Sequence, residues 1–198
     1  MNDPLAPLGD GHTKVPDDVR GQLIPTYIAT LGELHEAEEA NIATGTFGRA
    51  PTAAQLLDDR HLRALHRVMF NDVWRWAGRY RQHDVNIGGV SWHEVPGLVR
   101  QLAADATFWV GAETFEPDEL AMRFHHRLVQ IHAFVNGNGR HGRFAAEYLV
   151  EGLGRTRFTW GHNLGLERSE LRAQYRRALQ KMDRDRDDVA DLVAFSRA

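Results

Sequence analysis

The chain has 198 residues, of which 42% are hydrophobic, a formal net charge of -3 and no cysteine. This length predicts a single domain with a sizeable core. Without cysteine, a disulfide framework and a thiolate zinc site are excluded, which favours the cytoplasm. The charge balance argues against an all-over nucleic-acid surface, and no apolar run reaches the length of a membrane span. We therefore expect a cytoplasmic protein without direct nucleic-acid or membrane contacts.

The first half of the chain predicts a short leader followed by helices. Residues 1–20 are rich in Pro, Gly and Asp and are expected to form a flexible leader, whereas residues 21–198 are expected to form one domain. Apolar residues at helical spacing predict helices at about 30–43 and about 59–76.

The segment between residues 79 and 92 has a different pattern. Val85 and Ile87 alternate with polar residues, Gly88-Gly89 offers a turn, and Val90 begins a second alternation. This pattern predicts a short β-hairpin.

Further helices are predicted in the second half of the chain. Pro96 is expected to begin one that runs to about Val110, and Pro117 one that runs to His132. Apolar spacing predicts two more helices, at 140–150 and 168–182.

The run from His132 to Arg143 (HAFVNGNGRHGR) combines groups that suit phosphate chemistry. Gly137 and Gly139 can adopt positive φ and turn backbone N–H groups toward one point, and a helix is expected to follow. Arg140 and Arg143 lie three residues apart, so both share a face of its first turn. The alternative is a pair of Asn-Gly turns, with Arg143 pairing with Glu147.

His132 is expected at the end of the preceding helix, next to this glycine loop. An imidazole titrates near neutrality and can accept a proton from a hydroxyl while a bound phosphate is attacked. The alternative is a structural histidine held by hydrogen bonds. Its position beside the loop favours the catalytic role.

The run resembles the active-site motif of Fic-domain proteins: His, any residue, Phe, any residue, Asp or Glu, Gly-Asn-Gly-Arg, two variable residues and Arg. All fixed positions match except the acidic one, which is Asn136 here. The resemblance implies a mainly α, Fic-type helical bundle with a short hairpin flap near the active site. It also implies the transfer of AMP from ATP to a target protein. The implied base is His132, and the implied phosphate ligands are Gly137, Asn138, Gly139, Arg140 and Arg143.

Asn136 stands where the family usually places the acidic ligand of the Mg²⁺ on the nucleotide. An amide oxygen can bind Mg²⁺ but brings no negative charge. Segments from Gly21 onward also resemble a Fic group called mobile mystery protein B, in which an asparagine at this position is usual. That group is similar to the toxin half of a bacterial gene pair, which implies a helix-turn-helix partner protein.

The resemblance assigns roles to two further segments. The flap is implied to pair with the backbone of the target protein through Asn86, Ile87, Gly88, Gly89 and Val90. Many Fic proteins carry an inhibitory helix whose glutamate pairs with the second motif arginine. In the acidic helix at 30–43 the best candidate is Glu39, although His35 and Ala40 depart from the pattern. The alternative is a solvated acidic helix face.

Two sets of residues allow both a binding and a structural interpretation. Tyr175 and Leu179 are similar in setting to the family's adenine pocket, but core packing explains them equally well. His125, His126 and His141 raise the question of a metal-dependent hydrolase, although their spacing matches no compact zinc motif. The alternative for His125 and His126 is that they line the core or support the motif loop.

The sequence therefore predicts a protein adenylyltransferase (AMPylator) that uses ATP and Mg²⁺ and modifies a Tyr, Ser or Thr hydroxyl, with its activity restrained by autoinhibition. Three alternatives remain open. One is the reverse, de-AMPylating hydrolysis, and another is transfer of a different phosphate-linked group. The third is a weakly active, toxin-antitoxin-like protein that binds a helix-turn-helix partner.

Overall fold

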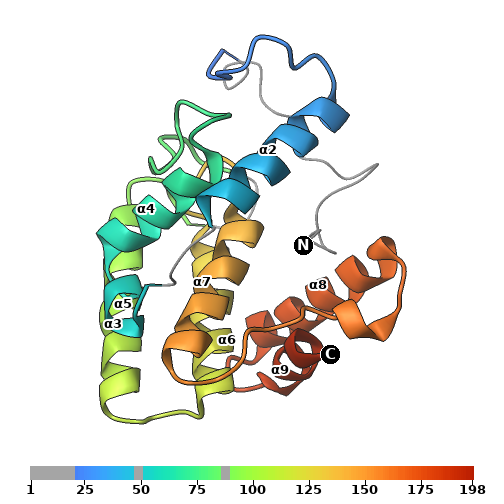
Figure 1. Cartoon of the computed structure of the whole chain (residues 1–198). Coiled ribbons are helices and arrows are strands. Elements are labelled where there is room, and N and C mark those ends of the chain that lie inside the picture. The colour runs from blue at the N-terminus through green and yellow to red at the C-terminus, as the bar shows by residue number, and fades with distance from the viewer. Residues whose placement is uncertain (1–20, 47–50, 86–89) are drawn as a thin grey trace.

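The computed structural model describes residues 21–46, 51–85 and 90–198, and within them the chain is mainly helical, as predicted (Figure 1). The elements in chain order are α2 (Leu31–Gly45), α3 (Ala53–Leu56), α4 (Asp59–Phe70), α5 (Val95–Gly111), α6 (Pro117–Ile131), α7 (Asn138–Gly152), the 3₁₀ helix η1 (His162–Leu164), α8 (Arg168–Arg184) and α9 (Ala190–Arg197). None of the helices in these ranges is long and apolar enough to cross a membrane.

Local sequence signals place several helix starts. Thr30 caps α2 in a reciprocal capping box with Glu33, which satisfies two otherwise unpaired N–H groups. Pro117 occupies the first turn of α6, where its missing N–H costs nothing, and two acidic residues complement the positive end of the helix. These signals explain why both starts were predictable from the sequence.

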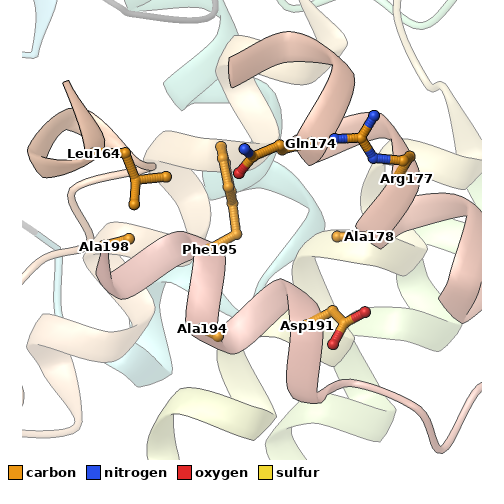
Figure 2. Close-up of a pocket in the computed structure, with 8 residues that line it drawn as sticks. All are labelled: Leu164, Gln174, Arg177, Ala178, Asp191, Ala194, Phe195 and Ala198. Carbon is orange, nitrogen blue, oxygen red and sulfur yellow. The ribbon is translucent and has the colours of Figure 1, made fainter. Parts of the chain in front are cut away.

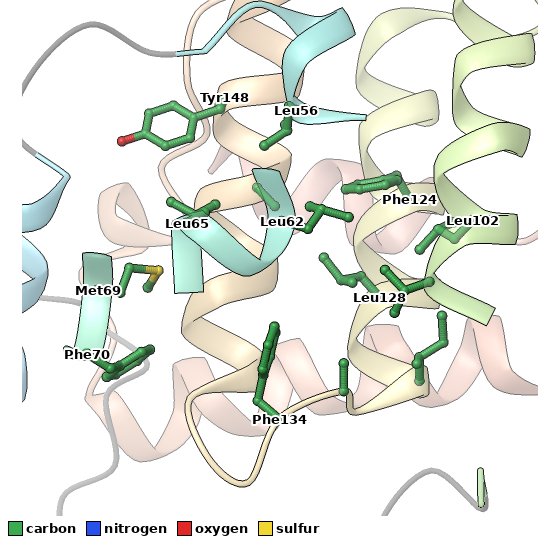
Figure 3. Packing of buried hydrophobic residues seen from close by; sticks show 14 of the residues in the cluster. Leu56, Leu62, Leu65, Met69, Phe70, Leu102, Phe124, Leu128, Phe134 and Tyr148 are labelled. Carbon is green, nitrogen blue, oxygen red and sulfur yellow. The ribbon is translucent and has the colours of Figure 1, made fainter. Parts of the chain in front are cut away.

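Helices α6 and α7 pack against each other at the centre of the molecule. Helix α5 covers α6, α3 and α4 contact α7, and α2 packs on α4 (Figure 1). Phe70, Phe124 and Phe134 are fully buried in the shared core and are labelled in Figure 3. Each large apolar side chain buried in this way contributes roughly 1.5–3 kcal/mol, so this core fixes the loop between α6 and α7.

A second, smaller core joins α8 and α9 to the other side of the central pair. Met122 of α6 and Val150 of α7 meet Tyr175, Met182 and Leu192 there. The loop between α6 and α7 and the first turn of α7 therefore have different neighbours on their two sides. Helices α2 and α4 lie on one side, and α8 lies on the other.

The predicted helix at 59–76 ends earlier than expected, at Phe70. The chain pairs next with an extended segment, through the Leu23–Trp74 bridge and hydrogen bonds from Ile24 N–H to the Val73 carbonyl and from Arg75 N–H to the Gln22 carbonyl. If α4 continued, the carbonyl of Val73 and the N–H of Arg75 would form hydrogen bonds within the helix instead. Helices α3 and α9 were not predicted, because four and eight residues are too short for a clear period.

Two of the sequence predictions concern residues outside the described ranges. The predicted leader at 1–20 lies there entirely. The predicted flap lies there with four of its residues, Asn86, Ile87, Gly88 and Gly89. The described residues on either side, 79–85 and 90–92, contain no strand. The hairpin is thus not seen and stays a prediction.

Candidate active site

The run from His132 to Arg143 forms a tight loop followed by the first turns of α7. His132 follows the last residue of α6 with a left-handed backbone (φ 51°), and Gly137 precedes α7 with φ 77°. A Cβ at Gly137 would lie 2.5 Å from the ring of Phe70. Only glycine fits this position, because both the dihedral angle and the close approach exclude a side chain.

Asn138 holds the loop closed. Its Oδ1 accepts from the N–H of Phe134 and its Nδ2 donates to the carbonyl of Phe134, both at 2.8 Å. The side chain of Asn138 is therefore a brace of the loop. Its backbone N–H lies at the first position of α7, where N–H groups have no acceptor within the helix.

His132 is half-buried at the mouth of this loop. Burial lowers its pKa to about 4, and the positive charge of Arg81 acts in the same direction, against the opposing effect of the Val129 carbonyl. The imidazole is therefore neutral at pH 7. A neutral imidazole can accept a proton, which is the state that a general base requires.

The two arginines of the run are buried and face different helices. Arg140 forms a 2.6 Å ion pair with Glu38 of α2 and lies over the ring of Phe70. Arg143 lies over the ring of Tyr175 of α8, 5.8 Å from its centroid. Two guanidinium groups beside a helix N-terminus suit an anion such as phosphate once the Glu38 carboxylate no longer occupies Arg140.

His66 of α4 contacts the loop between α6 and α7. Its Nδ1 accepts from the N–H of Gly78 at 3.0 Å, so Nε2 carries the proton and donates to the carbonyl of Asn136 at 3.1 Å. Its ring stacks on Phe134 with centroids 3.7 Å apart. Burial holds the pKa of His66 well below its usual value, so this tautomer persists at neutral pH.

Family comparison agrees with this geometry. The model of the Fic/DOC family matches residues 56–150, which contain α4 to α7 and the loop. The chain therefore contains a Fic domain. Members of this family commonly transfer AMP or other nucleotide-linked groups to proteins.

Solved Fic structures share the fold at low sequence identity. The Fic domain of Bep8 from Bartonella sp. 1-1C is 14% identical, with a TM-score of 0.68 over 87% of this chain and 88% of that one. BepC from Bartonella tribocorum, solved with bound AMPPNP, is 17% identical (TM-score 0.65, 84% and 87% covered). Fic-1 from C. elegans is 22% identical (TM-score 0.64); 89% of this chain and 51% of that chain are covered.

The Fic motif offers few ligands for a metal ion. The side-chain oxygen of Asn136 accepts from the N–H of the next residue, Gly137, at 2.7 Å. No group of three or more His, Asp or Glu residues able to hold a metal occurs in the part of the chain that the structure describes. One amide oxygen does not make a resident Mg²⁺ site, so a metal ion here would have to arrive on the phosphates of a nucleotide.

The three histidines considered as metal ligands make structural contacts instead. His125 hydrogen-bonds the hydroxyl of Tyr175 at 2.9 Å, His126 contacts Asp183, and His141 contacts the carbonyl of Leu62. They do not converge, so the metal-hydrolase alternative gains no support from the described residues. Their contacts join α6 to α8 and α7 to α4.

The predicted adenine residues lie beside Arg143. Tyr175 is buried in the second core, and Leu179 packs against the same cluster. Phe195 stands 6.0 Å from the Tyr175 ring and also lines a hollow of about 420 Å³ between α8 and α9 (Figure 2). The residues that line this hollow include none of the Fic motif.

The sequence predicted Glu39 as the inhibitory residue, whereas in the structure the neighbouring Glu38 contacts the motif arginine Arg140. Glu38 is 1% exposed and bridges Arg140 and the indole N–H of Trp74, each at 2.6 Å. Glu39 is half-buried. Glu38 lies four residues after buried Leu34, so a carboxylate on the apolar stripe of α2 was the signal that the sequence analysis missed.

Two more residues of the site were missed, His66 and Arg81. His66 occupies a core position of α4, where its polarity is visible only as an exception to the apolar pattern. Arg81 follows α4 in a segment without regular structure, and its guanidinium contacts the carbonyl of His132 at 2.8 Å. No local sequence pattern predicts that contact, which joins residues 51 positions apart.

Proposed function

We propose that the protein transfers AMP from ATP to a hydroxyl of a target protein. The observation that carries this proposal is a neutral His132 beside the N-terminus of α7, with two buried arginines on the first turns of that helix. The AMPPNP in BepC and the ADP in a Fic domain from Bartonella quintana support a nucleotide as the ligand.

In the proposed reaction, the target oxygen attacks the α-phosphorus of ATP in line with the leaving pyrophosphate. A new O–P bond forms as the bond to the β-phosphate oxygen breaks. The Nδ1 atom of His132 is shielded from solvent, so we assign the proton of the target hydroxyl to Nε2. Backbone N–H groups from Gly137 to Gly139, together with Arg140 and Arg143, would stabilise the phosphate charge.

Arg140 can serve this reaction only after Glu38 releases it. A guanidinium that is paired with a buried carboxylate has fewer donors for phosphate, and the carboxylate repels a nucleotide of the same sign. We propose that Glu38 restrains the enzyme in the state described here. Glu39, the residue expected from the family pattern, remains a second candidate on the same helix.

Recognition of the substrates remains part of the proposal. Tyr175 and Leu179 would border the adenine, because Tyr175 lies under Arg143 and the nucleotide must extend away from the phosphates. The target would lie against the segment that ends at Val90, whose carbonyl accepts from Arg81. Mg²⁺ would enter as the counterion of ATP, and the side-chain oxygen of Asn136 would be available as one of its ligands if it left the N–H of Gly137.

The test uses ATP labelled at the α-phosphate or at the γ-phosphate, with Glu38→Gln protein and a lysate as the source of targets. Label from the α-position on protein, together with a 329 Da mass increase, is the outcome that AMP transfer requires. His132→Ala should lower the rate about 10²- to 10⁴-fold, as expected for loss of a general base. His162→Ala, an exposed histidine far from the motif, is the matched control.

Other outcomes would replace the proposal. Label from the γ-position would indicate transfer of a different group, and release of AMP from a modified protein would indicate the reverse hydrolysis. The engaged side chain of Asn136 favours one further candidate, a weakly active protein that binds a helix-turn-helix partner. Failure to label any protein with ATP and either Mg²⁺ or Mn²⁺ would favour that candidate.

A further inference from the structure

Arg81 is a buried arginine whose guanidinium is used almost entirely for backbone carbonyls. Its side chain is 2% exposed and donates to three of them: that of His132 from Nε, that of His83 from Nη1 and that of Val90 from Nη2. The distances are 2.8, 2.9 and 2.6 Å. Its own backbone N–H donates to the carbonyl of Ala133 at 3.0 Å.

The first set of these bonds holds the turn at the proposed base. His132 has a left-handed backbone, which few residues other than glycine adopt without cost, and such a conformation persists only where its surroundings fix it. Arg81 binds the carbonyls of both His132 and Ala133. These bonds fix the peptide from which the imidazole projects.

The second set joins the described residues His83 and Val90 to the same side chain. Their carbonyls are seven positions apart in the sequence, yet both meet the same guanidinium. Asp84 adds two further contacts here. Its Oδ1 atom lies 3.6 Å from Nη1 of Arg81 and accepts a hydrogen bond from the N–H of Trp92 at 2.8 Å. His83, Val90 and the turn at His132 therefore share one anchor.

We propose that Arg81 is a positioning residue that sets the distance between the base His132 and the backbone at His83 and Val90. This inference rests on the proposed function, in which the chain near Val90 borders the target protein. In-line transfer requires the hydroxyl oxygen, the base and the phosphorus in near-attack geometry, and a shift of about 1 Å can cost about 100-fold in rate. One rigid planar fork satisfies three carbonyls in fixed directions, which a lysine ammonium on a flexible stem cannot reproduce.

The first arm of the test measures structure and needs no activity. Hydrogen exchange is compared among wild type, Arg81→Lys and the matched control Arg79→Lys, an exposed arginine two residues earlier. The expected result is faster exchange in Arg81→Lys in peptides containing His83 or Val90 and also in peptides containing His132. The control should leave both sets unchanged. Faster exchange in one set only, or in neither, would overturn the proposal.

The second arm measures transfer kinetics in the Glu38→Gln background. Arg81→Lys should lower kcat about 100-fold and raise the KM for the target protein, with the KM for ATP within about twofold of the parent. A general loss of fold would raise the KM for ATP as well, and that result would contradict a positioning role. If the parent transfers nothing, the proposed function fails, and the exchange experiment still decides whether Arg81 joins the two segments.

Asp84→Ala provides a second variant in case Arg81→Lys does not fold. The Asp84 side chain is 67% exposed, so its removal leaves the core intact while weakening the contacts near Val90. Exchange should rise in peptides containing His83 or Val90 but not in those containing His132, and the KM for the target should rise more than kcat falls. Equal exchange increases in both sets would show that the segments are coupled without Arg81.

Discussion

The two sides of α7 hold the Fic motif by different physical means. On the α2 and α4 side, Arg140 is paired with a buried carboxylate of α2, and His141 hydrogen-bonds a backbone carbonyl of α4. On the α8 side, Arg143 lies over the aromatic ring of Tyr175, whose hydroxyl bonds His125. One arginine thus meets a carboxylate and the other an aromatic face. Under the proposed function, the α2 side would restrain the site, and the α8 side would border the adenine.

Acidification should have the largest effect, and it tests both sides together. Burial lowers the pKa of His125 to about 3 and that of His141 to about 4. Since both values lie below the unfolded value of about 6.5, the unfolded state binds more protons, and stability falls as the pH drops from about 6.5 toward 4. Two such groups should together cost about 3 kcal/mol of unfolding free energy between pH 6.5 and pH 5.

Urea unfolding at pH 5, 6 and 7.5 measures this dependence. His125→Gln and His141→Gln should each reduce the slope, because each removes one buried titrating group. If only one of the two variants reduced the dependence of the unfolding free energy on pH, the two sides of α7 would differ in how proton binding affects their stability. Stability that is constant over this range would contradict burial of neutral histidines on either side.

Removal of the Glu38 carboxylate should have the next largest effect, confined to the α2 side. Glu38→Gln keeps a hydrogen-bond acceptor for the Trp74 indole but removes the negative charge beside Arg140. We expect AMPPNP to bind at least tenfold more tightly, which corresponds to about 1.4 kcal/mol. Titration calorimetry measures this affinity.

Glu39→Gln is the matched control for this prediction, since it removes the same charge one residue away. It should change the affinity by less than about twofold if Glu38 is the inhibitory residue. If Glu39→Gln increased the AMPPNP affinity more than Glu38→Gln did, the inhibitory residue would be Glu39. A thermal melt of both variants checks that the loss of a buried charge partner has not unfolded the protein.

Removal of the Tyr175 hydroxyl should have the smallest effect and should act on stability alone. Tyr175→Phe keeps the ring beneath Arg143 but leaves the buried Nε2 of His125 without its partner. The expected cost is about 1–2 kcal/mol of unfolding free energy, typical of a lost buried hydrogen bond. AMPPNP affinity should stay within about twofold of wild type. A large loss of affinity would show that the Tyr175 hydroxyl, and not only its ring, contacts the nucleotide.

Much of the fold follows from local pattern. The Pro117 start, the apolar period through Leu128 and the glycines of the motif are enough to predict α6, the loop and α7. The end of α4 does not follow, because pairing with the segment near Leu23 interrupts that helix at a point its own sequence does not mark. The hairpin flap lies largely outside the described residues and stays a prediction.

The sequence by itself determined the family, the helical class and the set of residues that could do phosphate chemistry, since these depend on short-range spacing within one motif. Only the tertiary structure decided which carboxylate meets Arg140. Glu38 and Glu39 differ by about 100° around the axis of α2, and the partner that selects between them lies 102 residues away. The contacts of Arg81 with His132 and of His66 with Asn136 arise in the same way. Each satisfies a partly buried backbone carbonyl that meets its donor only after the helices have packed.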